Sequence, residues 1–239
     1  MLGRNSRRFP RAAECLTSPW VGKCIAVVRE QRIELWDVAK SKLLKAAPFE
    51  HTRIDASSFS RDGKLLAISD RNELMLWNWE ANTHERIALG RRVDSLAFSP
   101  DGKFLAEGPA AAENIQVRDV ATRTVVRTLA NRARRSMSVP RMAYTQSGRV
   151  LIAGDTTASA NEAAKPHRVN LWDTADGSLA HQLTIPEGLP QSLEVSPNGR
   201  YLVAMVSGND GVRMSVWRLD GELRVAEPGP KPPATTRPP

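Results

Sequence analysis

Acidic side chains recur at fixed places along this chain and are the first candidates for chemistry. Asp37, Asp119 and Asp173 each end an apolar run, whereas Asp55 and Asp94 lie just before one. Carboxylates that converge on one axis could hold a metal ion and activate water, as a hydrolase would require. The repeated spacing instead places Asp37, Asp119 and Asp173 at the same kind of turn in separate segments. We therefore expect them to accept backbone hydrogen bonds there.

Basic side chains are concentrated in two stretches, which suggests a binding site. Residues 131–141 read NRARRSMSVPR, and residues 155–168 form an insertion in a later segment. Arginine grips carboxylates and phosphates through paired hydrogen bonds, so clustered arginines would bind a partner that carries either group. The alternative is a solvated loop in an arginine-rich chain. The candidate partner-binding residues are Arg132, Arg134, Arg135, Arg141, Lys165 and Arg168.

Tryptophan also recurs, and it has two possible roles. Exposed indole rings could stack on nucleic-acid bases, but rings at one fixed position of a repeated strand are expected to pack between sheets. The recurring tryptophans are Trp36, Trp77, Trp172 and Trp217. The sequence has no nucleophile elbow, phosphate-binding glycine loop, zinc-binding HExxH motif or paired CxxC motif. We therefore expect no enzymatic activity, no cofactor and no metal.

Two sequence units alternate along the chain and must position these residues. The first unit reads FSRDGKLLAIS, FSPDGKFLAEG, YTQSGRVLIAG and VSPNGRYLVAM, starting at Phe59, Phe98, Tyr144 and Val195. The second is centred on Trp36, Trp77, Arg118, Trp172 and Trp217, about every 40 to 50 residues. A glycine after Asp, Ser or Asn predicts a tight hairpin turn with positive φ. Each period therefore predicts four short strands.

This pattern resembles the WD40 repeat family from about residue 12 to residue 225. Trp36-Asp37 and Trp172-Asp173 match the dipeptide that names the family, while Trp77-Asn78, Arg118-Asp119 and Trp217-Arg218 are degenerate versions of it. The resemblance implies an all-β fold, a WD40-type β-propeller with about five four-stranded blades. The expected blades are residues 12–48, 54–89, 93–130, 140–185 and 190–225.

Rings of this family usually close with about seven or eight blades, so five blades leave the closure open. Three possibilities follow: a compact five-bladed ring, an open arc that forms a homodimer, and a fragment of a larger protein such as a kinase-linked propeller. Outside the blades, the basic N-terminus (residues 1–11) and the proline-rich tail (residues 226–239) are expected to be disordered.

The overall composition fits an interaction protein in the cytoplasm. Much of the net charge of +8 comes from residues 1–11, so the folded part carries an ordinary charge. The two cysteines predict reduced thiols, and no apolar run is long enough to cross a membrane. We expect a non-catalytic scaffold that binds protein partners through a loop-rich face. The alternatives are nucleic-acid or polyanion binding through the arginine patch and, as a further possibility, a propeller hydrolase.

Overall fold

The computed structural model shows a chain built from β-strands in five sheets. It describes residues 14–15, 24–29, 31–49, 54–109, 114–130, 142–155, 167–185, 189–196, 200–208, 211–219 and 225–226. Each sheet holds four strands that follow one another in the chain, and neighbouring strands are antiparallel. The predicted all-β architecture with about five four-stranded blades is confirmed. No helix in these described ranges is long and apolar enough to cross a membrane.

We number the sheets 1 to 5 along the chain. Sheet 1 consists of β1 (Glu14–Cys15), β2 (Cys24–Arg29), β3 (Arg32–Asp37) and β4 (Lys42–Pro48). Sheet 2 consists of β5 (Ala56–Phe59), β6 (Leu65–Asp70), β7 (Glu73–Asn78) and β8 (Thr83–Ala88). Sheet 3 consists of β9 (Val93–Phe98), β10 (Phe104–Pro109), β11 (Ile115–Asp119) and β12 (Val125–Leu129). Sheet 4 consists of β13 (Met142–Tyr144), β14 (Val150–Asp155), β15 (His167–Asp173) and β16 (Leu179–Ile185). Sheet 5 consists of β17 (Leu189–Val195), β18 (Tyr201–Gly208), β19 (Gly211–Leu219) and β20 (Val225–Ala226).

Glycine shapes the first turn of sheets 2, 3 and 4, as the sequence predicted. The φ angles of Gly63, Gly102 and Gly148 are 75°, 71° and 76°. This left-handed region is accessible to glycine at little cost, whereas a side chain would strain it. The backbone N–H of Gly102 donates to the carbonyl of Ser99 at 2.9 Å and closes the turn. The equivalent glycine of sheet 5, Gly199, lies outside the described residues.

The sheets pack face to face through four apolar clusters, one between each pair of successive sheets. Three of the recurring tryptophans lie in these clusters: Trp77 between sheets 1 and 2, Trp172 between sheets 3 and 4, and Trp217 between sheets 4 and 5. They are at most 2% exposed. The predicted packing role is thus confirmed for these three rings. Trp36 in sheet 1 is only half-buried.

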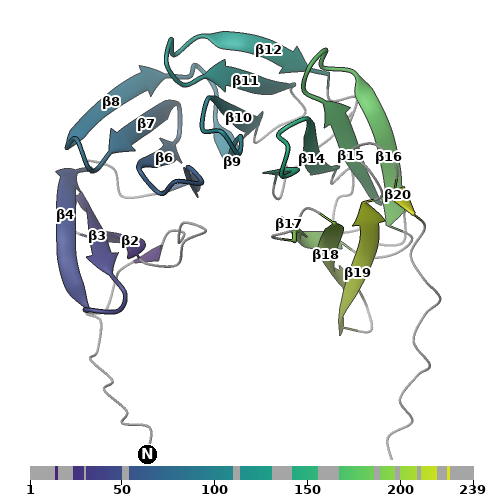
Figure 1. Cartoon of the computed structure of the whole chain (residues 1–239), viewed down its shortest axis with the longest axis horizontal. Helices are drawn as coiled ribbons and strands as arrows, with labels where there is room; N and C mark the ends of the chain where they lie inside the picture. Colours follow the sequence, from purple (N-terminus) through teal and green to yellow (C-terminus); the bar gives the residue numbers. More distant parts are fainter. Residues whose placement is uncertain are drawn as a thin grey trace, which may run out of the picture.

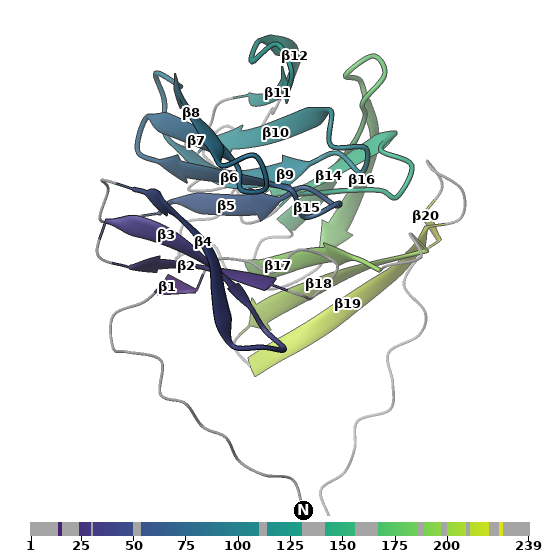
Figure 2. The ribbon, with the colours of Figure 1, turned by 60° about the vertical axis from the view of Figure 1, so that its left-hand side comes forward.

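The stacked sheets form an arc whose two ends are sheet 1 and sheet 5 (Figure 1). The first strands of successive sheets line its inner side, where β5 contacts β9, β9 contacts β13 and β13 contacts β17. Figure 2 shows the sheets from another side, with sheet 3 at the top of the view and sheets 1 and 5 lowest. Among the described residues, no apolar cluster contains side chains of both sheet 1 and sheet 5.

Two element boundaries differ from the sequence prediction. The fifth blade was expected to end at residue 225, but its last strand, Val225–Ala226, reaches residue 226 and pairs with the end of β19. The insertion predicted at residues 155–168 is shorter, because Asp155 and Arg168 face each other as paired residues of β14 and β15. The backbone ladder thus extends past the predicted bounds of these strands. Of the segments predicted to be disordered, 1–11 and 226–239, only Ala226 is described, as the last residue of β20; the rest lies outside the described residues.

Candidate functional site

The sheets have two ends that differ in how their polar groups are used. The turn end carries the first and third connections of each sheet, such as residues 60–64 and 79–82 of sheet 2. The loop end carries the second connection and the link to the next sheet, such as residues 71–72 and 89–92. Because neighbouring strands are antiparallel, every sheet contributes to both ends.

At the turn end, a hydroxyl group organises the first turn of sheets 2 to 5. In sheet 2, Ser60 Oγ donates to Asp62 at 2.6 Å and accepts from the backbone N–H of Leu65 at 2.9 Å. Comparable backbone contacts are made by Ser99 in sheet 3, Thr145 in sheet 4 and Ser196 in sheet 5. These hydroxyls satisfy the turn itself, so they are structural groups.

The recurrent acids organise the second turn. Asp119 Oδ1 accepts from the backbone N–H groups of Ala121 and Thr122 at 2.9 and 2.8 Å. The hydrogen bond from Thr122 is the main cause that lowers the pKa of Asp119. Equivalent backbone bonds are accepted by Asp37, Asn78 and Asp173. The acids thus fill the hydrogen-bonding role predicted from their spacing.

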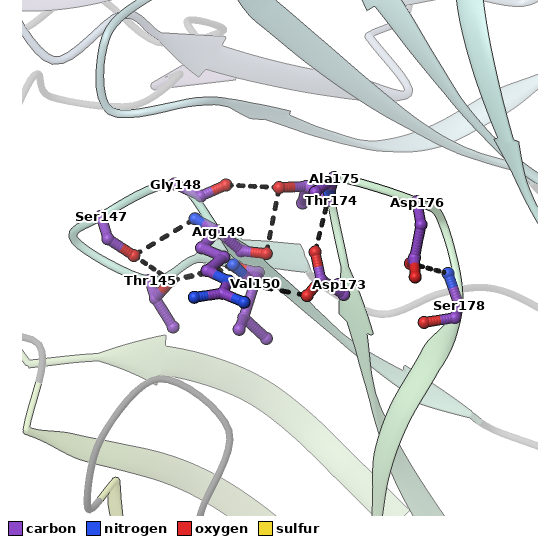
Figure 3. Close-up of polar contacts among 10 residues, drawn as sticks. All are labelled: Thr145, Ser147, Gly148, Arg149, Val150, Asp173, Thr174, Ala175, Asp176 and Ser178. Carbon is purple, nitrogen blue, oxygen red and sulfur yellow. Dashed lines mark hydrogen bonds and ion pairs between the residues drawn. The ribbon is translucent and has the colours of Figure 1, made fainter.

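The two turns of sheet 4 also bind each other, as Figure 3 shows. Thr174 Oγ1 donates to the carbonyl oxygens of Gly148 and Arg149 at 2.8 and 3.0 Å. The guanidinium group of Arg149 lies 3.6 Å from the Asp173 carboxylate. The polar groups of these two turns are therefore paired with one another.

At the loop end, an ion-pair cluster connects sheets 2 and 3. Arg92 lies 2.9 Å from Asp55 and 2.8 Å from Asp94. Asp55 also accepts from the backbone N–H of Arg71 at 2.8 Å. The Asp55 side chain is 1% exposed, whereas that of Arg92 is 44% exposed. We call Asp55, Arg92 and Asp94 the acid–arginine cluster; it presents one solvent-exposed guanidinium above two anchored acids.

This cluster brings together the two acids that were considered for a hydrolase. Arg92 pairs with both of them, and its positive charge opposes the binding of a metal ion at the same place. The described residues contain no group of three His, Cys, Asp or Glu side chains that could hold a metal. Arg92 was not among the predicted site residues; it lies directly before β9, whose second residue is Asp94.

A second missed group lies between sheets 2 and 3, beside the acid–arginine cluster. Arg118, at the position that holds tryptophan in the other sheets, forms a two-bonded ion pair with Glu107, whose side chain is fully buried. Arg118 also donates to the carbonyl of Arg123 at 2.6 Å. Arg91 bridges the carbonyls of Glu107 and Asn114 at 3.2 and 2.8 Å. Arg91 therefore links two carbonyls near the loop end, whereas Arg118 ties Glu107 to the turn-end connection that contains Arg123.

A hollow also opens near the loop end between sheets 1 and 2. Its lining consists of Phe49, Ile68, Asp70, Glu73, Met75 and Arg86. It has space for about one water molecule, so it cannot enclose an organic substrate.

The predicted arginine patch falls mostly outside the described residues. Arg168 is described: it is exposed and lies in β15, paired with Asp155 on one side and Thr184 on the other. It is thus a strand residue near the loop end. The rest of the patch, Arg132, Arg134, Arg135, Arg141 and Lys165, lies outside the described ranges and stays a prediction.

Comparisons with known proteins give a fold and no family. No protein-family model matches the sequence, and no curated protein matches it. Among solved structures, the chain is similar to the Cps50 (Swd1) β-propeller domain of Myceliophteria thermophila, with 16% identity, a TM-score of 0.70, and coverage of 89% of this chain and 70% of that one. It is also similar to the hydrazine synthase of Kuenenia stuttgartiensis, with 16% identity, a TM-score of 0.68, and coverage of 85% of this chain but only 61% of that one. At this identity the likeness establishes the propeller fold alone.

Proposed function

We propose that this chain is a non-catalytic cytoplasmic scaffold that binds a protein partner through the loop end of its sheets. The observation that carries the proposal is the contrast between the two ends. At the turn end the recurrent hydroxyls and acids bind the turns themselves, whereas at the loop end Arg92 is 44% exposed above the two acids that hold it. Loops and side chains held by a rigid scaffold are where recognition is usually built.

The charge of the loop end suggests what the partner presents. Arg168 and Arg92 are exposed there. The sequence between β12 and β13 contains Arg132, Arg134 and Arg135, and we propose that these residues extend the same surface. Guanidinium groups bind carboxylates through paired, charge-assisted hydrogen bonds. We therefore propose that the partner contributes acidic side chains.

Charge reversal at each end of the sheets provides a matched test. The test variant carries Arg132→Glu, Arg134→Glu and Arg135→Glu, and the control carries Lys40→Glu, Arg61→Glu and Lys103→Glu at the turn end. Partners captured from a lysate of the native host by the tagged full chain would be quantified by mass spectrometry. We expect the test variant to lose the partners that the control retains, since only the test variant repels an acidic surface.

Two outcomes would contradict the proposal. Equal recovery of every partner by the wild type and the test variant would remove the loop end as the binding surface. Tight binding of a mixed-sequence oligonucleotide, with an affinity that falls steeply as salt rises, would favour the nucleic-acid alternative because it indicates release of counterions from phosphates.

A further inference from the structure

The outer face of sheet 5 is exposed at positions that are buried in every other sheet. Met214 occupies the place held in the third strands of sheets 1 to 4 by Ile33, Leu74, Ile115 and Val169. Those four side chains are 0% exposed, whereas Met214 is 69% exposed. Two residues further on, Leu171 in sheet 4 is 1% exposed and Val216 in sheet 5 is 39% exposed.

The exposed positions form one continuous apolar surface. The register pairs Met205 with Met214 and Val203 with Val216, and side chains alternate between faces, so these four lie on one side of the sheet. Tyr201 and Val212 extend the surface to its two ends, with exposed fractions of 41% and 66%. We call Tyr201, Val203, Met205, Val212, Met214 and Val216 the outer face of sheet 5.

This surface is held firmly in place. On the opposite side of the same strands, Leu202, Ala204 and Trp217 are at most 2% exposed and pack against sheet 4. At eight and nine residues, β18 and β19 are also the longest strands in the described part of the chain. The outer face is therefore a broad, flat and rigid apolar surface, the kind that marks an interaction site.

We infer that a second copy of this chain covers the outer face of sheet 5 with its own sheet 5, around a two-fold axis. The exposed parts of the six side chains amount to roughly 500 Å² per copy, so a symmetric pair would bury about 1,000 Å², near the lower limit for a specific interface. A two-fold contact uses the same surface on both copies and closes after two, which makes it the commonest arrangement of homo-oligomers.

The positions of charged residues favour sheet 5 over sheet 1 as the surface of the second copy that covers the outer face of sheet 5. The outer side of sheet 1 carries a charged group at its centre, because Glu34, which is 2% exposed, is bound by Arg32 at 2.7 Å and by Trp36 Nε1 at 3.0 Å. The Arg32 side chain is still 50% exposed, and covering it with methionine and valine would remove water from a guanidinium without replacing its hydrogen bonds. On sheet 5 the described charged residues of this side are Glu194, paired with Val203, and Arg218, paired with Tyr201, whereas the positions at its centre, Met205, Met214 and Val216, are apolar.

Sedimentation velocity of the full chain tests this inference. Between about 5 and about 500 µM, the range expected for an interface of this size, the mass should rise from 26.3 kDa toward twice that value. Met214→Glu should weaken the association at least about tenfold, because two carboxylates would enter an apolar interface. Its exposure means that the monomer should fold unchanged, which thermal unfolding would verify.

Two further variants distinguish this surface from others. Val126→Glu replaces an apolar residue that is 49% exposed in β12, and Leu43→Glu replaces one that is 40% exposed beside Trp36 on the outer side of sheet 1. Both should associate like the wild type. A wild type that stays at 26.3 kDa throughout, or a Met214→Glu variant that associates normally, would overturn the inference. So would dissociation by Leu43→Glu or growth beyond two copies, since either indicates a head-to-tail contact.

Discussion

The two faces of sheet 5 have similar compositions and opposite surroundings. Leu202, Ala204 and Trp217 face sheet 4 and are buried, whereas Met205, Met214 and Val216 face away from it and are exposed. The repeat places apolar residues on both faces of every sheet, because each interior sheet has two neighbours. The comparison shows that this alternation specifies how sheets stack and does not specify where the stack ends.

The interior interfaces themselves differ in one informative way. Trp172 fills the contact between sheets 3 and 4, whereas its equivalent Arg118 lies between sheets 2 and 3 and needs a buried carboxylate, Glu107. At the position of Glu107, sheets 2, 4 and 5 carry Ile68, Ala153 and Ala204. A buried cation is tolerated only with such a partner. Substitutions at interior positions should therefore lower the free energy of unfolding strongly, and substitutions on the outer face should change it little.

The largest effect is expected where one half of the buried ion pair is removed. Arg118→Ala leaves the Glu107 carboxylate buried without its partner, which should cost about 3–5 kcal/mol of unfolding free energy. The double variant Arg118→Trp with Glu107→Ala gives the contact between sheets 2 and 3 the tryptophan and alanine found between sheets 3 and 4. It should recover most of that loss. Urea denaturation of both variants measures their unfolding free energies. Equal losses would show that the pairing of Arg118 with Glu107 contributes little.

A deletion in the apolar contact between sheets 4 and 5 should come next. Leu171 is 1% exposed and packs in the cluster shared by these sheets. Leu171→Ala removes buried methyl groups and leaves a cavity, with an expected loss of about 2–5 kcal/mol in urea denaturation. The comparison would be weakened by a loss below 1 kcal/mol (roughly the value for surface changes), because the interface would then be loosely packed.

The sequence predicted the parts of the fold that depend on local or repeated signals. Gly102 follows Asp101 in a tight turn, and the positive φ that this pair suggests is present. Trp77, Trp172 and Trp217 recur at one strand position and each is buried against the preceding sheet, whereas Trp36 holds the same position in the first sheet and is half-buried. Strand ends were less accurate at Ala226 and Asp155, because backbone pairing continues beyond the predicted bounds.

The acid–arginine cluster could not be predicted in the same way. Asp55 and Arg92 belong to different sheets, and their contact depends on how sheet 2 stacks on sheet 3. No periodic pattern encodes that distance. The Glu107–Arg118 pair left a fainter signal: an acid and an arginine each replace an apolar residue within one repeat. Read together, these two substitutions could have identified the pair.

A smaller, pH-dependent effect is expected at the turn end, at Asp119. Hydrogen bonds to the Asp119 carboxylate, first that from Thr122, keep its pKa below the ordinary value of 3.8. Its contribution to stability is therefore present above pH 3.8 and is lost as the pH falls through the lower, folded-state value. Asp119→Asn keeps an acceptor that does not titrate, so its stability should fall less steeply in acid than that of the wild type.

Chemical denaturation from pH 6 down to about pH 2.5, a window that starts above the ordinary pKa of Asp119 and extends below it, measures the difference. Other carboxylates at this end, such as Asp101 and Asp176, also have lowered pKa values and are common to both proteins. The difference between the two curves therefore isolates Asp119. Parallel curves would mean that its hydrogen bonds are equally strong when the group is protonated.

The smallest effect on stability is expected on the outer face of sheet 5. Met214→Ala, at the position where Ile33 and Val169 are fully buried in their own sheets, should change the unfolding free energy of the monomer by no more than about 0.5 kcal/mol. The measurement must be made at low micromolar concentration, because association would add stability that depends on concentration. Val169→Ala is the matched control and should cost several times more, since it opens a cavity between sheets 4 and 5. If both variants lost the same free energy in dilute solution, the outer face would already be covered within a single chain, and the contrast between the two faces of sheet 5 would disappear.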